Sequence, residues 1–281
     1  MRRKQVQDMA GWGNSPIAYF DGKPLAHSQL YVEPYACETD VPSGVVARSN
    51  FFDLLPRLLG TPDKLGHQVV VVLGDPGIGK SLAARELILR TAQRYLHASS
   101  TEGVPFPIYI QGSWFLQKEV REAHHISDLI RIALHAHGQR LRATESIQNK
   151  CFDPPTDDEP VLLVVDDLDA TQLTKQQQRA LFQALGSRDR KHQAVLFSRR
   201  ASLDVSVLQD FEIPQVELQE FATEEADSQV QEWLARWNLL VKRNESLTQE
   251  RIKQRDLSLF ELSKRPILLR ILAESWDRLS S

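Results

Sequence analysis

Short apolar runs, several of them rich in β-branched residues, alternate along the chain with segments of helical periodicity. A run in which every residue is apolar predicts a strand that is covered on both faces, as in a parallel sheet. Four runs have this character: Val69 to Leu73, Phe106 to Ile110, Val161 to Val165 and Ala194 to Phe197. A fifth, weaker candidate is Val216 to Leu218, which Glu217 interrupts. Because strands that alternate with helices imply crossover connections, we expect an α/β fold with a mostly parallel sheet flanked by helices.

Helices are predicted where apolar residues recur three and four positions apart. After the first predicted strand, Ala84, Leu87 and Ile88 begin such a stripe, which continues to Tyr95. Three further segments show the same periodicity: Val45 to Leu59, Ile126 to His137 and Lys175 to Leu185.

Beyond residue 221 the strand signal disappears and only helical periodicity remains. Thr223 is expected to cap a helix that carries Glu224 and Glu225 in its first turn, since acidic side chains there complement the helix dipole. A last helix is expected to begin at Pro266, because proline suits the first helical turn. Residues 222–281 are therefore predicted to form a small helical subdomain beside the sheet.

The first 45 residues lack clear periodicity and carry several glycines and prolines. This composition is typical of an arm or linker. We therefore divide the chain into an N-terminal arm or linker at 1–45, an α/β domain at 46–221 and the helical subdomain at 222–281.

Composition narrows the class of protein without defining it. The chain has 281 residues, of which 42% are hydrophobic and 25% charged, as in an ordinary folded globule. Its net charge of -3 argues against a protein that coats nucleic acid or an anionic membrane. Cys37 and Cys151 match no metal or redox spacing, and no stretch resembles a signal peptide or a membrane span. We expect a cytoplasmic protein with two free thiols.

A phosphate-binding loop, or P-loop, lies between the first predicted strand and the helix that follows it. The pattern G-x-x-x-x-G-K-[ST] is matched by Gly74, Asp75, Pro76, Gly77, Ile78, Gly79, Lys80 and Ser81, and Leu82 comes next. Glycines let the backbone aim N–H groups at phosphate oxygens, and the helix N-terminus favours anions. Lys80 is expected to reach the β- and γ-phosphates, and the Ser81 hydroxyl to bind Mg²⁺. The sequence thus predicts binding of ATP or GTP with Mg²⁺.

Three aspartates follow the apolar run at 161–165. Asp166 ends that predicted strand, in the Walker B position, and is expected to hold Mg²⁺ through water. Asp167 and Asp169 are both candidates for orienting or deprotonating the attacking water, and the sequence does not separate them.

Another predicted strand, at 194–197, ends in polar and basic residues. Ser198 or Arg199 is a candidate sensor of the γ-phosphate, and a pair of surface arginines is the alternative interpretation. An extra predicted strand, at 106–110, is expected to lie between the P-loop and the acidic strand. This arrangement is typical of the P-loop branch with an additional strand beside the P-loop strand, and not of kinases or small GTPases.

Two groups of residues carry weaker signals: the histidines His124, His125, His135 and His137, and the aromatic residues Tyr109, Trp114 and Phe115. No acidic or cysteine partners accompany the histidines, so solvated helix positions are favoured over a metal site. For the aromatic residues, an aromatic core is favoured over a platform for base stacking.

The P-loop, the acidic strand at 161–169 and the strand end at 196–200 together resemble the NACHT branch of the STAND NTPases. In that family the acidic strand commonly reads apolar-D-G-L-D-E, and the later strand commonly ends in T-S-R-P. Residues 216–225, followed by Trp233, are similar to the family's passage into its helical subdomain. The resemblance spans residues 46 to 281.

The resemblance also extends to Arg265-Pro266-Ile267, which is similar to the apolar-flanked proline motif of the family's helical subdomain, and it implies that Pro266 lies near the nucleotide. Asp167 stands where the family usually has a small residue, and Ala170 where it often has Glu. Arg200 replaces the usual proline. The missing Glu implies slow hydrolysis, for which Asp167 and Asp169 could compensate.

Taken with these residues, the resemblance implies a nucleotide-dependent molecular switch that binds ATP or GTP with Mg²⁺, with ADP bound at rest. It implies slow NTP hydrolysis, self-association through the NTPase domain, and effector and sensor modules within a signalling or defence protein, either antiphage or innate immune. Two alternatives stay open. One is a remodelling ATPase of AAA+ type, in which Arg265 or Arg270 would serve as a lid arginine. The other is a module that binds nucleotide without hydrolysing it.

Overall fold

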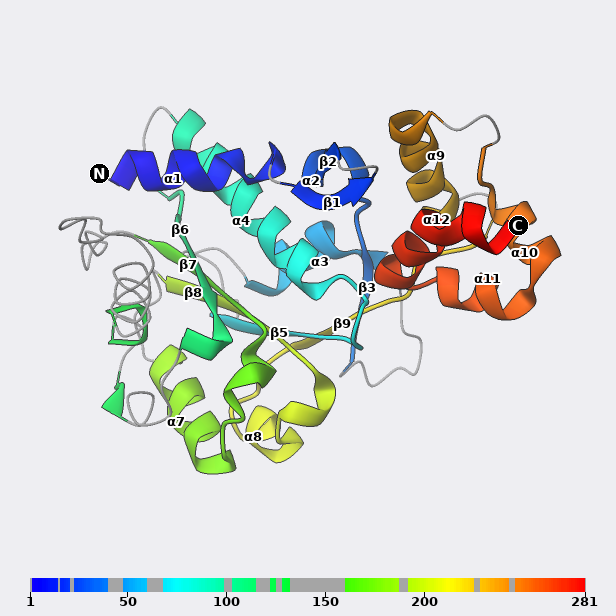
Figure 1. Ribbon diagram of the computed structural model, residues 1–281. Helices are drawn as coiled ribbons and strands as arrows, with labels where there is room; N and C mark the ends of the chain where they lie inside the picture. The colour runs from blue at the N-terminus through cyan, green and yellow to red at the C-terminus, as the bar shows by residue number, and fades with distance from the viewer. Residues whose placement is uncertain are drawn as a thin grey trace.

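A computed structural model describes the chain except for residues 1, 15, 21–22, 40–47, 60–67, 99–102, 115–121, 125–127, 132–159, 187–191, 225–227, 243–245 and 281. It shows a seven-stranded sheet flanked by helices, with a cluster of short helices at one end (Figure 1). Among the described residues, no helix is long and apolar enough to cross a bilayer.

Five parallel strands form the centre of the sheet and one edge. In spatial order from that edge they are β6 (Phe106–Gln111), β7 (Val161–Asp166), β8 (His192–Ser198), β5 (Val69–Leu73) and β9 (Gln215–Leu218). Every residue of β5 and β7 is buried, as their unbroken apolar runs predict. The predicted α/β fold with a mostly parallel sheet is confirmed.

The additional strand beside the P-loop strand is β8, which pairs with β5 on one side and β7 on the other. The run at 106–110 is not that strand: it forms β6, which pairs with β7 at the edge of the sheet. Chain order therefore differs from sheet order, because the crossover after β5 places β6 at the far edge.

Helices cover both faces of the sheet (Figure 1). α3 and α4 lie on one face, with α1 alongside α4, and α7 and α8 lie on the other. Their bounds are Arg2–Ala10 for α1, Phe51–Leu59 for α3, Lys80–His97 for α4, Lys175–Leu185 for α7 and Val205–Asp210 for α8.

One predicted helix begins later than expected, and another is described only in part. The helix predicted from Val45 begins only at Phe51, since Ser49–Asn50 form β4. Of the helix predicted at 126–137, residues 128–131 are described, and they are helical. The rest of it lies outside the described residues, as do Cys151, Phe115 and three of the four candidate histidines.

The N-terminal segment, predicted as an arm or linker, contains regular structure that joins both cores. After α1 come the short 3₁₀ turn η1 (Gly11–Asn14), the hairpin β1–β2 (Pro16–Phe20, Lys23–Ala26) and α2 (His27–Leu30). The next strand, β3 (Tyr35–Glu38), pairs antiparallel with β9 and with β4. Through β3 the N-terminal segment therefore contributes a strand to the main sheet, while β1 and β2 form a separate two-stranded sheet.

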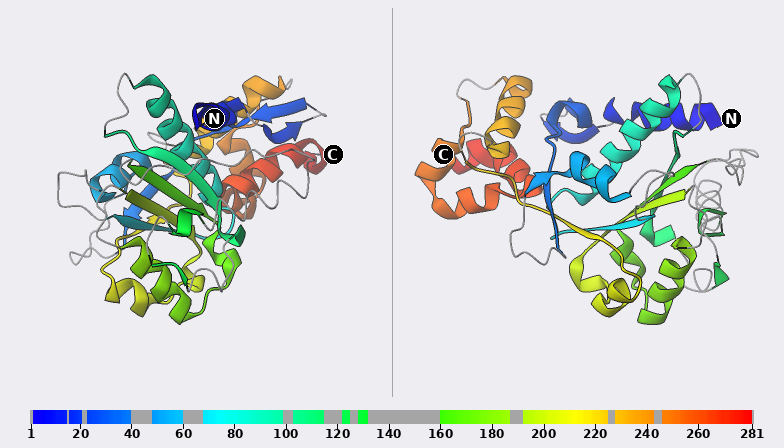
Figure 2. Two further views of the ribbon diagram at one scale, coloured as in Figure 1. Left: turned by 90° about the vertical axis from the view of Figure 1, so that its left-hand side faces the viewer. Right: turned by 180° about the vertical axis from the view of Figure 1, so that it is seen from behind.

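Four helices form the cluster at the end of the sheet: α9 (Gln229–Val241), α10 (Gln249–Arg255), α11 (Leu257–Ser263) and α12 (Pro266–Ser280). They share a core in which Trp233 stacks on Trp237 with ring centroids 5.3 Å apart. Leu30 and Val32 of the N-terminal segment complete this core. Accordingly, the hairpin and α2 lie between α4 and α9 (Figure 2).

The starts of the first and last of these helices test two predictions. The last helix begins at Pro266, as predicted. The cap of α9 is Ser228, whose side chain accepts a hydrogen bond from the Gln231 N–H, and not Thr223. The Thr223 carbonyl instead accepts from the Gln249 amide. A capping residue needs the helix to start directly after it, and α9 begins only at Gln229.

Candidate functional site

The P-loop connects the end of β5 to the start of α4 through residues with unusual backbone angles. Gly77 and Gly79 have φ values of 82° and 100°, a region that residues with a side chain rarely adopt. Gly79 is the N-cap of α4 and supplies no side-chain cap. The first N–H groups of α4 are therefore free of a side-chain acceptor at the cap and point toward an anion that would bind at the loop.

Lys80 is half-buried at the start of α4, and its ammonium contacts the loop itself. Nζ donates to the Gly74 carbonyl at 2.7 Å and to the Asp75 carbonyl at 3.1 Å. Burial lowers the pKa of Lys80, although the aspartates after β7 oppose this. A phosphate at the loop would therefore compete with two backbone carbonyls for this ammonium and would offset its desolvation.

Asp166 is 3% exposed at the end of β7, and both of its carboxylate oxygens accept hydrogen bonds. Oδ1 accepts from the Ser81 hydroxyl at 3.2 Å, and Oδ2 accepts from the Tyr109 hydroxyl at 2.8 Å. Burial raises the pKa of Asp166, while these two hydrogen bonds act in the opposite direction. Burial and the Asp166 charge also raise the pKa of Tyr109, so its hydroxyl stays protonated and donates.

The pair formed by Ser81 and Asp166 fits a magnesium ion. A hydroxyl and a carboxylate stand side by side where the acidic strand meets the first turn of α4, and hard oxygen donors are the ligands that Mg²⁺ uses beside phosphates. The carboxylate is also buried, so a divalent cation there would relieve the cost of its desolvation.

The other two aspartates differ in what surrounds them. Asp169, with a side chain 8% exposed, forms an ion pair with Arg199, in which Nε and Oδ2 are 2.9 Å apart. Its other oxygen accepts from the Arg199 backbone N–H at 3.2 Å. Asp167 has a left-handed φ of 58° and lines the cavity described next. The structure thus separates the two residues that the sequence left equal.

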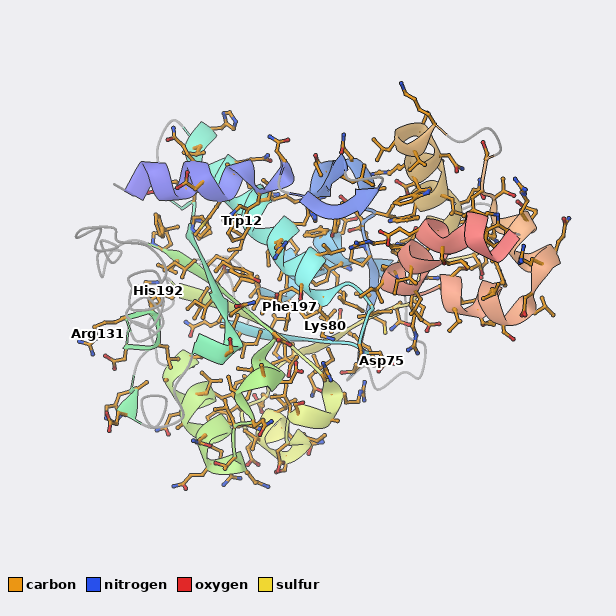
Figure 3. The ribbon with its side chains drawn as sticks, in the orientation of Figure 1. Trp12, Asp75, Lys80, Arg131, His192 and Phe197 are labelled. Atoms are coloured by element: carbon orange, nitrogen blue, oxygen red, sulfur yellow. The ribbon has the colours of Figure 1, made fainter. Side chains whose placement is uncertain are left out.

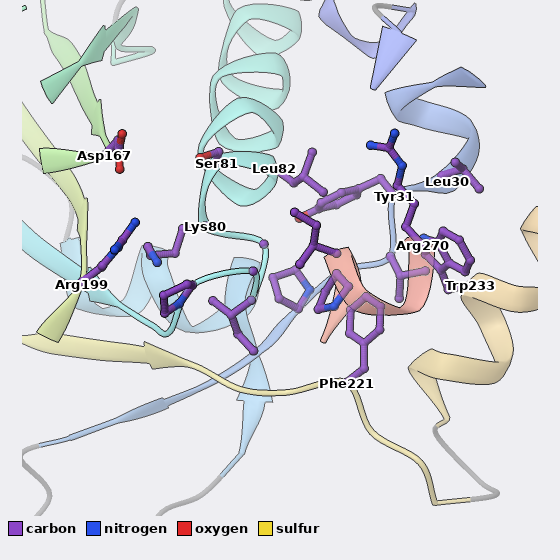
Figure 4. A pocket seen from close by; sticks show the side chains of 18 residues that line it. Leu30, Tyr31, Lys80, Ser81, Leu82, Asp167, Arg199, Phe221, Trp233 and Arg270 are labelled. Atoms are coloured by element: carbon purple, nitrogen blue, oxygen red, sulfur yellow. The ribbon is translucent and has the colours of Figure 1, made fainter. Parts of the chain in front are cut away.

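A cavity of about 360 Å³ lies between the P-loop, the N-terminal segment and the helical cluster. It is lined by Leu30, Tyr31, Val32, Pro34, Pro76, Gly77, Ile78, Gly79, Lys80, Ser81, Leu82, Asp167, Arg199, Phe221, Trp233, Pro266, Ile267 and Arg270. Lys80, Asp167 and Arg199 lie at one side of the cavity, and Tyr31 and Trp233 lie at the other, together with Arg270 (Figure 4). This is the division that a nucleotide requires, with phosphates at one end and a base at the other.

The first turn of α12 lies directly on the P-loop. The Ile267 N–H donates to the Gly77 carbonyl at 3.4 Å, and a Cβ placed on Gly77 would lie 2.5 Å from the Ile267 side chain. A Cβ on Gly79 would lie 3.8 Å from Pro266 Cγ. Arg265 adds ion pairs to Glu220 and, more loosely, to Asp75 of the loop. The helical cluster and the P-loop therefore share one contact surface.

The cavity contains many but not all of the residues predicted from the sequence. Pro76 to Leu82, Asp167, Arg199 and Pro266 line it, whereas Gly74, Asp75, Asp166 and Asp169 lie beside it.

Sequence reasoning missed the N-terminal wall of the cavity, which residues 30–32 and Pro34 form. The available signal was the short apolar run at 30–32 followed by that proline. It also missed the contact of Tyr109 with Asp166, because an aromatic residue on a strand is typical of a core.

Partly buried polar contacts hold the N-terminal wall against α4 and α9. His27 Nε2 contacts Glu86 of α4 at 3.0 Å, and Arg90 bridges Glu86 and Glu33. From α9, Arg236 donates to the Tyr31 carbonyl. The N-terminal wall is thus held in place by α4 on one side and α9 on the other.

A parallel sheet with the P-loop strand beside β8, a P-loop at the start of α4 and an acidic strand end against it define a P-loop NTPase. The NACHT domain family matches residues 68–236, more than half of the chain. The chain belongs to the NACHT family, a family of nucleotide-binding ATPases, and this membership implies binding of NTP and Mg²⁺.

Among solved structures, the Walker-type ATPase PABY2304 of Pyrococcus abyssi is similar to the chain. The identity is 16%, the TM-score is 0.45, and the alignment covers 82% of this chain and 67% of that chain. So distant a likeness carries no argument about function. No curated protein matches the chain.

Proposed function

We propose that this NACHT domain is a nucleotide-dependent molecular switch that binds ATP, or GTP, with Mg²⁺ and hydrolyses it slowly. The observation that supports a switch is the contact between the P-loop and the first turn of α12, made through Gly77, Ile267 and Pro266. Any change that a phosphate causes in the loop is transmitted directly to the helical cluster. A ligand shifts a conformational equilibrium only as far as it binds one conformation better than the other, and a nucleotide in the cavity would contact both the P-loop and the helical cluster.

The proposed roles follow from where the side chains lie. Lys80 would exchange its two carbonyl contacts for the β- and γ-phosphates, and the N–H groups of the loop would surround them. Ser81 and Asp166 would hold Mg²⁺, which supplies positive charge that neutralises the phosphates. Tyr31, Phe221 and Trp233 would contact the base at the aromatic end.

Slow hydrolysis is supported by the acidic groups. Asp169 is engaged by Arg199, so Asp167 is the aspartate that lines the cavity and could orient the attacking water. Position 170 holds Ala and contributes no further carboxylate. Arg199 would sense the γ-phosphate by leaving Asp169, which couples the phosphate to a change at the end of β8.

In this proposal ADP occupies the resting state, and ATP drives self-association through the NTPase domain, with effector and sensor modules in the same chain or in partners. The resulting role is in signalling or in defence, either antiphage or innate immune. Family resemblance supports this part.

The first test is nucleotide binding. Lys80→Ala removes a charge-assisted contact worth roughly 1.5–3 kcal/mol, so ATP and GTP affinity should fall more than tenfold in calorimetry. Lys175→Ala is a matched control, because that lysine pairs with Asp204 on the other face of the sheet. Equal affinity of the Lys80→Ala variant and the wild type would refute the assignment of the loop.

Hydrolysis is tested with Asp166→Asn. The amide keeps the shape of the side chain but loses the charge that faces Mg²⁺, so turnover should be abolished while binding of nucleotide partly survives. A phosphate-release assay on the wild type and the variant measures this. Turnover at the wild-type rate would show that the acidic strand is assigned incorrectly.

The switch itself is tested by hydrogen exchange and tryptophan fluorescence with ADP and with a non-hydrolysable ATP analogue. Amide protection in α9–α12 should differ between the two ligands, since the helical cluster lies on the loop that the γ-phosphate contacts. Identical protection with both ligands would favour the alternative of a static nucleotide-binding module.

A further inference from the structure

Tyr109 is a residue of the metal site that the P-loop and acidic-strand motifs do not include. It lies on β6, the strand next to β7, and its hydroxyl donates to Asp166 Oδ2 at 2.8 Å. The second carboxylate oxygen is bonded by Ser81 on α4. Asp166 is therefore oriented from two sides, by a hydroxyl on a neighbouring strand and by a hydroxyl on the P-loop helix.

The ring of Tyr109 is in turn held by the N-terminal segment. Trp12 packs against it edge to face, with ring centroids 5.1 Å apart and an interplanar angle of 86°. Trp12 belongs to η1, directly after α1, and it projects from there toward the sheet (Figure 3). The preference of aromatic pairs for this geometry fixes the orientation of the tyrosine ring and thereby that of its hydroxyl.

The turn that carries Trp12 is itself closely packed. A Cβ on Gly13 would lie 3.4 Å from the Leu89 side chain of α4, in van der Waals contact, so the turn lies close against the helix. Val6 of α1 is fully buried in the main core, and Met9 is nearly so. Contacts thus run without interruption from α1 through Trp12 and Tyr109 to Asp166.

We propose that Tyr109 is a positioning residue for the magnesium ligand Asp166, and that Trp12 sets it in place. The N-terminal helix and turn (residues 2–14) then control how tightly Mg²⁺ is held at the P-loop. This inference rests on the proposed function. Displacing α1 from α4 would loosen the tyrosine ring and weaken the metal site without touching the phosphate loop.

The test separates metal binding from nucleotide binding in the full chain. ATP affinity is measured by calorimetry in EDTA and then across a series of Mg²⁺ concentrations. In Tyr109→Phe, affinity in EDTA should equal that of the wild type, whereas the affinity for Mg²⁺ should fall roughly 10–100-fold, as is usual when a hydrogen bond to a metal ligand is removed. A matched control is Tyr95→Phe, since Tyr95 packs on Phe106 at the opposite end of β6.

Trp12→Leu should weaken Mg²⁺ binding by about two- to tenfold, because an edge-to-face pair is lost while the hydroxyl stays. In the Tyr109→Phe background, Trp12→Leu should not lower the affinity for Mg²⁺ any further, since both substitutions act on the Asp166 carboxylate. Trp12→Phe, which keeps an aromatic ring, serves if the leucine variant does not fold, and it should retain most of the affinity for Mg²⁺.

The failures are distinguishable. A wild-type chain that binds neither ATP nor GTP would overturn the proposed function, and this inference with it. A Tyr109→Phe variant with the Mg²⁺ dependence of the wild type, or with an equal loss in EDTA, would overturn the positioning role alone. Additive effects of the Trp12 and Tyr109 substitutions would overturn the link to the N-terminal turn.

Discussion

A methyl group at Gly77 is the smallest change that tests the contact between the P-loop and the helical cluster. A Cβ there would lie 2.5 Å from Ile267 Cγ2, far inside ordinary van der Waals distance. Gly77 also has a φ of 82°, so alanine incurs a backbone cost as well. Gly103 separates the two effects, because it has a φ of 78° and, among the described residues, no heavy atom within 4 Å of the place that a methyl group would take.

The two costs can be given magnitudes. A left-handed φ costs an L-residue roughly 1–2 kcal/mol, which is the whole expectation for Gly103→Ala. Gly77→Ala adds overpacking, which costs about 1–3 kcal/mol in close-packed sites. Ile267→Ala removes Cγ2, and since Ile267 is 51% exposed, it should cost no more than about 1 kcal/mol by itself.

Denaturant unfolding of the nucleotide-free protein gives the free energy of unfolding of the wild type and of four variants. These are the three single variants and the double variant Gly77→Ala with Ile267→Ala. The destabilisation by Gly77→Ala should exceed that by Gly103→Ala, and the excess should disappear when residue 267 is also alanine. If the two glycine substitutions cost the same, α12 does not lie on the P-loop in solution. If the excess persists without the isoleucine side chain, this contact is not its cause.

Two further predictions concern charged groups. Arg199→Ala should reduce the preference for a non-hydrolysable ATP analogue over ADP by about tenfold in competition binding, because a charge-assisted contact to the γ-phosphate is lost. Arg200→Ala is the control, since Arg200 pairs with Glu217 and its loss should leave this preference unchanged. An equal loss of preference in both variants would contradict a sensor role for Arg199. Burial acts to raise the pKa of Glu86, but hydrogen bonds from His27 and Arg90 outweigh it and hold that pKa below its ordinary value of 4.5. The stabilisation by this carboxylate is therefore complete above pH 4.5 and is lost as the pH falls through the lowered pKa. Glu86→Gln should cost about 1 kcal/mol in denaturant unfolding at neutral pH, and the difference from the wild type should shrink in acid; a constant difference would contradict this reasoning.

The strands and the P-loop could be predicted because their signals are local. A strand covered on both faces needs consecutive apolar residues, so β5 and β7 were visible as unbroken runs at 69–73 and 161–165. The loop needs glycine at 77 and 79 for its positive φ values, and a lysine and a hydroxyl at the helix start. Each of these requirements concerns residues only a few positions apart.

The distinction between Asp167 and Asp169 could not be read in this way. Both follow the same strand, and their residue type and exposure in a loop are equivalent in the sequence. Only the position of β8 brings Arg199 against Asp169, which leaves Asp167 at the cavity. The role of each carboxylate therefore depends on a partner 30 residues away.

Local sequence patterns were enough to identify the class of protein. They also predicted a phosphate site at the P-loop and a metal position shared by Ser81 and Asp166, whose side chains are hydrogen-bonded in the structure. Only the folded chain revealed the order of the strands, the contribution of Tyr31 to the cavity and the hydrogen bond from the Tyr109 hydroxyl to Asp166. The physical reason is that periodicity and backbone preference act within a few residues, whereas these contacts join segments far apart in the chain. Such contacts exist only once the cores around β5 and Trp237 have packed and brought those segments together.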